Sequence, residues 1–177
     1  MMKLLAWMLL GCAFAGTAYA AVVEVTPVGF GIKEEIATAA DARKVYNALT
    51  HDVGKWWDPK HTYSGDSRNL SIATKPGGCF CENLGHGGAV EHARVLVLIP
   101  DSQLRMSGAF GPLQSSGLVG TLSVKLTAAT GGTKIEMSYN VGGYMHGAFE
   151  NIAPVVDEVL ADQLKRLKLF VETGKAQ

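Results

Sequence analysis

The chain is 177 residues long and carries 16 Lys and Arg against 16 Asp and Glu, so its formal net charge is zero. A protein without excess positive charge has no field that draws in phosphates, and we therefore exclude nucleic acid as a partner. Hydrophobic residues make up 47% of the chain, and the length suits one domain with a proper core.

The first 20 residues have the pattern of an export signal. A short positive start precedes an apolar run, Leu4 to Leu10, and a small-residue cleavage site, Ala18-Tyr19-Ala20. The run is too short for a membrane anchor, which takes about 20 apolar residues, so no stable membrane span is expected. We predict a cleaved signal peptide (1–20), a single mature domain (21–177) and a periplasmic or secreted protein. A lipobox-like segment ending at Cys12 makes a lipoprotein the second interpretation.

The first part of the mature chain is expected to hold a strand and one or two short helices. Val22 to Val28 contains a proline and is predicted to be a loose arm or an edge strand. Period-two alternation from Phe30 to Ile36 predicts a strand. Asp41 can cap a helix from Ala42 to Leu49, and Val53 to Trp57 can form a further helical turn.

The middle of the chain alternates short apolar runs with glycine-rich turns, which is typical of an antiparallel sheet. The clearest alternation between apolar residues of a buried face and polar residues of a solvent-exposed face lies in Thr121 to Ala128 and Lys134 to Val141. Gly131-Gly132 is predicted to join these two strands as a hairpin. The other predicted strands are His61–Ser64, Leu70–Thr74, Cys79–Leu84, Ala89–Ile99 and Gln103–Ser107, and Gly108–Gly117 is predicted to be a loop.

The last long segment, Ile152 to Glu172, has the apolar spacing of an amphipathic helix, with Asn151 as the predicted N-cap and Gly174 as its end. Gln163 lies near the centre of the apolar stripe. The stripe consists of Ile152, Val156, Val159, Leu160, Leu167 and Phe170. Such a stripe needs a large apolar partner. A curved antiparallel sheet of about six to seven strands wrapped on the helix supplies it, which makes the fold class α+β.

Four stretches carry a resemblance to a known superfamily. They are Lys55–Tyr63, Gly77–Glu82, Gly108–Gln114 and Ala161–Leu164. With the order of the elements, they resemble the helix-grip fold of the SRPBCC (START-like, birch-pollen-allergen-like) superfamily, and most of all an exported branch that groups with activator-of-heat-shock-ATPase-like and polyketide-cyclase-like proteins. The resemblance implies binding of lipids, hormones or polyketides, with cyclisation or dehydration in some members. Because no catalytic set is shared across the superfamily, it assigns no catalytic residue here.

We expect the ligand site between the sheet and the C-terminal helix, without a cofactor. Trp56 and Trp57, with His61 and Tyr63, can form an aromatic rim at its mouth, although packing of the short helices explains at least one Trp equally well. Gln163 is expected to look into the cavity. The predicted ligand-binding residues are Trp56, Trp57, His61, Tyr63, Phe80, Glu82, His92, Arg94, Phe110, Tyr139 and Gln163.

Cys79 and Cys81 lie two apart on one predicted strand, and three interpretations stay open. On a flat strand their Cα atoms lie about 6.6 Å apart, near the upper limit for a disulfide, so they are either two buried thiols or a redox-active disulfide at a bulge. The third interpretation is a metal site. A four-residue turn at 85–88 places His92 on the thiol face, whereas a five-residue turn pairs His92 with Glu82. No zinc-like spacing is present, and we predict no metal.

Three functions fit the sequence. The first is an exported protein that binds a small, largely apolar molecule. The second is an enzyme of the cyclase, dehydratase or lyase type, which requires at least two of Glu82, His92, Arg94 and Arg105 to converge in a cavity. The third is a chaperone-like or thiol-based role with a protein partner.

Overall fold

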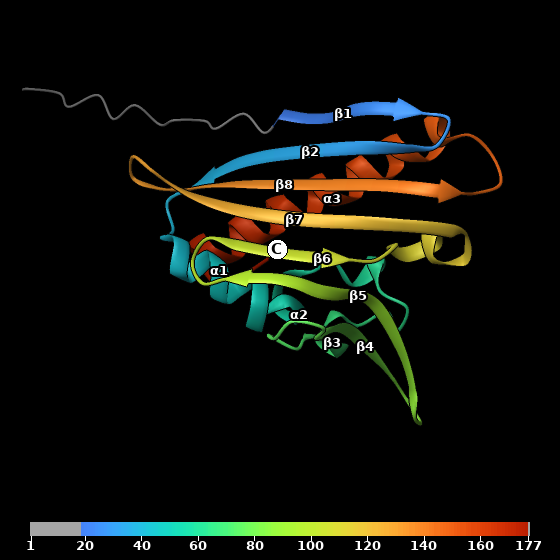
Figure 1. Ribbon diagram of the computed structural model, residues 1–177. Helices are drawn as coiled ribbons and strands as arrows, with labels where there is room; N and C mark the ends of the chain where they lie inside the picture. Colours follow the sequence, from blue (N-terminus) through green and yellow to red (C-terminus); the bar gives the residue numbers. More distant parts are fainter. Residues whose placement is uncertain (1–18, 177) are drawn as a thin grey trace, which may run out of the picture.

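The computed structural model describes residues 19–176 and the side chains of residues 22–176. Within this range eight strands form one antiparallel sheet in the order β1-β2-β8-β7-β6-β5-β4-β3 (Figure 1). The strands are β1 (Tyr19–Thr26), β2 (Gly29–Thr38), β3 (Leu70–Ile72), β4 (Cys79–Gly85), β5 (Gly88–Ile99), β6 (Gln103–Ser107), β7 (Gly117–Ala129) and β8 (Gly132–Tyr144). The helices are α1 (Ala42–His51), α2 (Val53–Trp56) and α3 (Phe149–Thr173), and the short helical turns are η1 (Pro59–His61), η2 (Ser67–Asn69) and η3 (Gly111–Ser115).

The long helix α3 lies along one face of the curved sheet, with α1 and α2 against it (Figure 1). The α+β class and the helix-grip arrangement are therefore confirmed. The sheet has more strands than expected, because the N-terminal arm pairs with β2 as one edge and β3 forms the other. The predicted apolar signal run and Cys12 lie outside the described residues. No helix in residues 19–176 is long and apolar enough to cross a membrane.

The strand alternation places one face of the sheet against the helices, as predicted for β7 and β8. Leu122 pairs with Tyr139 and Val124 with Met137, and all four side chains are buried. Successive residues of a strand face opposite sides, so these inward residues alternate with polar ones on the outer face. The inner face and α3 enclose the hydrophobic core.

The ends of the helices follow the sequence in part. The Asp41 carboxylate accepts a hydrogen bond from the Lys44 N–H at 2.8 Å, which confirms it as the N-cap of α1. The predicted N-cap of α3, Asn151, is wrong, because α3 begins at Phe149 without a side-chain cap and the Asn151 N–H already donates to the Ala148 carbonyl. Gly174 ends α3 as predicted, with a positive φ of 79°.

The predicted strand His61–Ser64 is wrong. The Asp58 carboxylate accepts from the Lys60 N–H at 2.9 Å and starts the helical turn η1, and bends follow it. The segment then folds over the inner face of β4, where the backbone N–H groups of Tyr63 and Ser64 both donate to the Glu82 carboxylate. A strand would not direct two consecutive N–H groups to one side chain, so the buried carboxylate explains the irregular backbone.

Candidate functional site

A cavity of about 430 Å³ lies between the sheet and the N-terminal half of α3. The helix contributes a row of aliphatic side chains, namely Ile152, Val155, Val156, Val159 and Leu160. Ile152, Val156 and Val159 are half-buried, whereas Val155 is 53% exposed. This part of the predicted stripe therefore borders the cavity instead of packing into a solid core.

The wall opposite α3 is aromatic. Phe80 lies 5.7 Å from Trp57 and 6.2 Å from Phe110 between ring centroids, and Phe110 lies 5.2 Å from Tyr139. All four side chains line the cavity. They come from a loop, β4, the β6–β7 connection and β8, so the wall forms only when distant segments of the chain meet.

Tyr139 holds one wall in place. Its hydroxyl donates to the Gly108 carbonyl at 2.9 Å and accepts from the Phe110 N–H at 3.1 Å. Burial raises the pKa of this phenol to about 12, so the hydroxyl stays protonated at neutral pH. With both bonds directed at the backbone, Tyr139 fixes the loop that carries Phe110 against the cavity.

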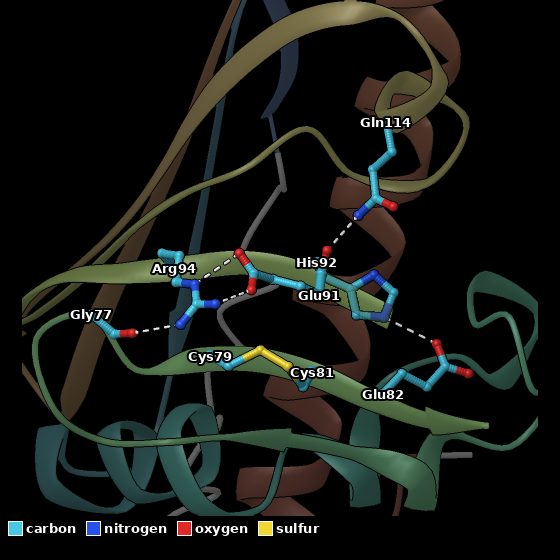
Figure 2. Close-up of a disulfide and its surroundings, with 8 residues drawn as sticks. All are labelled: Gly77, Cys79, Cys81, Glu82, Glu91, His92, Arg94 and Gln114. Atoms are coloured by element: carbon cyan, nitrogen blue, oxygen red, sulfur yellow. Dashed lines mark hydrogen bonds and ion pairs between the residues drawn. A yellow bond between two sulfur atoms is a disulfide. The ribbon is translucent and has the colours of Figure 1, made fainter. Parts of the chain in front are cut away.

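The main polar feature of the cavity wall is an acid–imidazole pair. The His92 ring lines the cavity, and its Nε2 lies 3.0 Å from Oε2 of the fully buried Glu82 (Figure 2). Burial opposes ionisation of Glu82, but the hydrogen bonds from Ser64, Tyr63 and His92 outweigh it and lower the pKa of this carboxyl. Burial also lowers the pKa of His92, more than the bond to Glu82 raises it. At neutral pH the pair is a carboxylate and a neutral imidazole.

The protonation states fix the tautomer of His92. An ionised carboxylate only accepts hydrogen bonds, so the proton of the neutral imidazole must be on Nε2, toward Glu82. Nδ1 then carries the lone pair of the ring and is a hydrogen-bond acceptor. A carboxylate that orients a neutral imidazole is an arrangement suited to hydrogen-bond recognition or to proton abstraction.

The register of the β4–β5 hairpin follows neither predicted turn. A two-residue turn, His86-Gly87, connects Gly85 to Gly88, and both turn residues have positive φ, as a type I′ turn requires. Farther along, Phe80 pairs with Ala93 and Cys81 with Glu91, so His92 is the extra residue of a bulge. This bulge turns His92 to the inner face, where Glu82 lies.

The two cysteines of this hairpin are joined by a disulfide in the structure, with their Cα atoms 5.3 Å apart. The interpretation as two buried thiols is therefore wrong, and a redox role stays a prediction. Among residues 19–176 no group of three or more His, Cys, Asp and Glu side chains is placed to hold a metal ion. The bulge separates the sulfur atoms from His92, because the disulfide lies on the outer face and the imidazole on the inner one.

Seven of the eleven predicted ligand residues line the cavity, namely Trp57, His61, Tyr63, Phe80, His92, Phe110 and Tyr139. Glu82 does not line the cavity; it is fully buried and contacts His92, which does. Trp56 is instead a core residue whose indole donates to the Ala48 carbonyl, and Arg94 lies on the outer face in an ion pair with Glu91.

Gln163 does not look into the cavity, contrary to the prediction. It is completely buried, and its Oε1 accepts from the Asp58 N–H at 2.9 Å. This bond ties the start of η1 to α3. A polar residue in an apolar stripe indicates a buried hydrogen bond, but the sequence does not tell whether its partner is the backbone or a ligand.

Further residues line the cavity without having been predicted as ligand residues, namely the aliphatic row of α3 together with Lys60, Thr62, Leu70, Gly111, Pro112 and Leu113. The row was visible as a stripe, yet the sequence contains no signal that distinguishes a helix face on a cavity from one on a solid core. Lys60 is exposed in a turn, where a cation is usually solvated.

Solved structures share this fold at low sequence identity. The Aha1 dimer from Colwellia psychrerythraea is 24% identical, with a TM-score of 0.57, over 82% of this chain and 98% of that chain. CalU16 from Micromonospora echinospora is 16% identical, with a TM-score of 0.55, over 90% and 88%. The conserved protein EF2215 from Enterococcus faecalis is 17% identical, with a TM-score of 0.61, over 92% and 80%. No family model and no curated protein matches the sequence. These likenesses show the fold, and the function has to be argued from the site.

Proposed function

We propose that this chain is an exported binding protein that holds a small, largely apolar molecule between its sheet and α3. The observation that carries the proposal is the cavity of about 430 Å³, with aliphatic side chains on one wall and aromatic rings on the other. Sites for small molecules typically measure about 300–1,000 Å³ and combine apolar walls with a few placed polar groups. The cavity meets both criteria.

The His92 side chain defines the ligand further. His92 offers Nδ1 as an acceptor, so we propose a ligand that carries a hydroxyl, phenol or N–H donor on an otherwise apolar frame. A ligand without a donor would leave this nitrogen unpaired when water is expelled, which lowers its affinity. Lys60 and His61 lie at the exposed side of the cavity, where a second polar group of the ligand would stay hydrated.

Binding can be tested with N-phenyl-1-naphthylamine, an apolar dye with one N–H donor whose fluorescence rises in a dry site. We expect the full chain to bind it, and Val156→Trp to weaken binding by on the order of tenfold or more, because the indole fills the cavity. Leu169→Trp is the matched control, since Leu169 lies on the same helix and does not line the cavity. Equal dye binding by both variants, or no binding by the unchanged chain, would contradict the proposal.

Export is a separate part of the proposal and has its own test. The full chain and a variant that lacks residues 1–20 are expressed in a bacterial host, and the periplasmic fraction is assayed for each. We expect the full chain to appear there, shortened to begin at Ala21, and the truncated variant to stay in the cytoplasm. Finding the full chain uncleaved in the cytoplasm would contradict export and would leave the proposed ligand binding unaffected.

Catalysis is a second candidate function, which the buried Glu82–His92 pair favours. A neutral imidazole oriented by a carboxylate can remove a proton from a bound molecule, as cyclisation or dehydration requires. The test recovers the molecule that copurifies with the chain and incubates it with the unchanged protein and with His92→Gln. Chemical conversion by the unchanged protein alone would establish an enzyme, and an unaltered molecule in both samples would establish binding.

A protein partner is the remaining candidate. The Colwellia psychrerythraea structure is a dimer of that protein. For this chain association is a proposal, which sedimentation of the purified full chain checks directly.

A further inference from the structure

The Cys79–Cys81 disulfide does not join distant parts of the fold. It connects two residues of one strand with a sequence separation of two. A disulfide stabilises a fold mainly by closing a loop in the unfolded chain, and this effect shrinks with the length of the loop. A bond across a single intervening residue therefore contributes little to holding the fold together, so its role has to be sought in the strand itself.

The bond shortens β4 at the place where β5 carries its extra residue. The two Cα atoms are 5.3 Å apart, compared with about 6.6 Å for two rises of an extended strand. Beside this contraction β5 bulges, so that His92 and Ala93 are consecutive and both buried, at 6% and 2% exposure. Without a bulge, neighbouring residues would face opposite sides of the sheet, and His92 would face outward if Ala93 stayed inside.

The two cysteines have cross-strand partners of opposite charge. Cys79 pairs across the sheet with Arg94, and Cys81 pairs with Glu91 (Figure 2). Arg94 is held in place by Glu91 and by the Gly77 carbonyl, to which it donates at 3.0 Å. Both cysteines are half-buried on the outer face, which α3 does not cover. Cys79 therefore has the cationic cross-strand partner and Cys81 the anionic one, which favours a thiolate at Cys79 over one at Cys81, and the Glu91–Arg94 ion pair reduces this difference.

We propose that Cys79–Cys81 is a thiol-exchange site for a dithiol partner, and that its reduction withdraws His92 from the cavity. A thiolate of the partner attacks Sγ of Cys81, the disulfide breaks, and Cys79 leaves as a thiolate beside Arg94. The second thiol of the partner then attacks the mixed disulfide and releases Cys81. Two electrons pass to the protein, the partner becomes a disulfide, and Cys79 and Cys81 take up the two protons that the partner loses.

Reduction changes the cavity because the Cys79–Cys81 disulfide lies next to the bulge that turns His92 inward. Once the bond is open, β4 can extend to its ordinary spacing and Cys81 can pair with His92 in a regular ladder. His92 then turns to the outer face, and its bond to Glu82 is lost. This inference goes beyond the proposed ligand binding and does not depend on it, since neither the exchange nor the movement of His92 requires a ligand.

The first experiment measures reduction of the folded chain. The full chain carries Cys12→Ser, so that every thiol detected comes from Cys79 or Cys81. It is treated with millimolar dithiothreitol under native conditions, with circular dichroism recorded alongside. We expect both thiols to become free while the fold is retained. Thiols that appear only when the protein unfolds would overturn the exchange site.

The second experiment follows His92 itself by NMR of the imidazole nitrogens, with His92→Gln to identify its signals. Reduction is expected to move these signals toward those of an exposed histidine, and Cys79→Ser combined with Cys81→Ser is expected to do the same without any reductant. The His61 signals serve as an internal control and should stay where they are, because His61 lies in η1 and not in the β4–β5 hairpin. Unchanged His92 signals in both samples would overturn the coupling.

The third experiment tests the direction of attack. With Cys12 replaced, Cys81→Ser leaves Cys79 as the single thiol, and Cys79→Ser leaves Cys81. We expect the Cys79 thiol to be alkylated by iodoacetamide several-fold faster at neutral pH, and Arg94→Gln to remove this advantage. A faster reaction at Cys81 would contradict the assigned leaving group.

Discussion

The two halves of α3 face the same sheet but have different neighbours. In the C-terminal half, Leu164, Leu167 and Val171 are completely buried in a solid core next to α1. In the N-terminal half, Ile152, Val156 and Val159 stay half-buried along the cavity. One amphipathic helix thus packs into a solid core along some of its turns and borders a cavity along the others.

Hydrogen bonds follow the same division. Within residues 19–176 the side-chain bonds that tie α3 to other elements come from Gln163, Arg166 and Glu172, all in the C-terminal half. The N-terminal half also contains Pro154, which cannot donate to the preceding turn of the helix. The half that borders the cavity is therefore held less firmly, which suits a helix segment that must yield when a molecule enters.

The largest difference between the halves should appear on truncation of a buried leucine. We expect Leu167→Ala to lower the free energy of unfolding by about 3 kcal/mol, because it removes a fully buried side chain and leaves a void. Val159→Ala should cost less than about 1 kcal/mol, since its side chain already borders a void. Urea unfolding of both variants gives the two values, and equal losses would contradict the division of α3.

The second effect concerns Glu82, the buried acid that contacts His92 at the cavity. Glu82→Gln should cost about 2 kcal/mol at neutral pH, because hydrogen bonds to a charged acceptor are lost or weakened. The pKa of Glu82 is lowered by folding, so its contribution is complete above the unfolded value of about 4.3 and is lost as the pH falls through the folded value. Melting temperatures measured across acidic pH should fall less steeply in the variant; an unchanged slope would exclude an ionised Glu82.

A third effect lies at the boundary between the halves. We expect Gln163→Leu to cost about 1 kcal/mol, because the partly buried Asp58 N–H loses its acceptor. Dye binding should stay within about twofold of the unchanged chain, since Gln163 does not line the cavity. Denaturant unfolding and dye titration of the same sample check both statements, and a large loss of binding would return Gln163 to the ligand site.

The smallest effect is the titration of His92. Burial lowers the pKa of His92 in the folded protein, so the unfolded chain takes up the proton first as the pH falls below about 6.5. Stability should therefore decline between this pH and the folded pKa, and His92→Gln should flatten that part of the profile. A steeper decline in the variant would contradict a neutral, buried imidazole.

The sequence predicted those features that depend on local pattern. The alternation in β7 and β8, the cap at Asp41 and the end of α3 at Gly174 are confirmed, and so are the class and the wrapping of the sheet. A bulge was expected only as the condition for a Cys79–Cys81 disulfide, and its place at His92 could not be predicted, because neither the two-residue turn nor the contraction of β4 leaves a local pattern in the sequence.

The same limit applies to the ligand residues. Of the four residues expected to form an aromatic rim, Trp57, His61 and Tyr63 line the cavity and Trp56 does not. Trp56 and Trp57 are adjacent and have the same residue type, yet one is core and the other lines the cavity. Only the path of the backbone after α2 separates them, and this path is set by the distant Glu82 and Gln163.

The most direct measurement is methyl NMR of α3 during a titration with N-phenyl-1-naphthylamine. The methyl signals of Ile152, Val156 and Val159 should shift as the dye enters, and those of Leu164, Leu167 and Val171 should stay in place, because only the first set borders the cavity. Shifts of equal size in both halves, or none in the N-terminal half, would contradict a binding site between the sheet and this part of the helix.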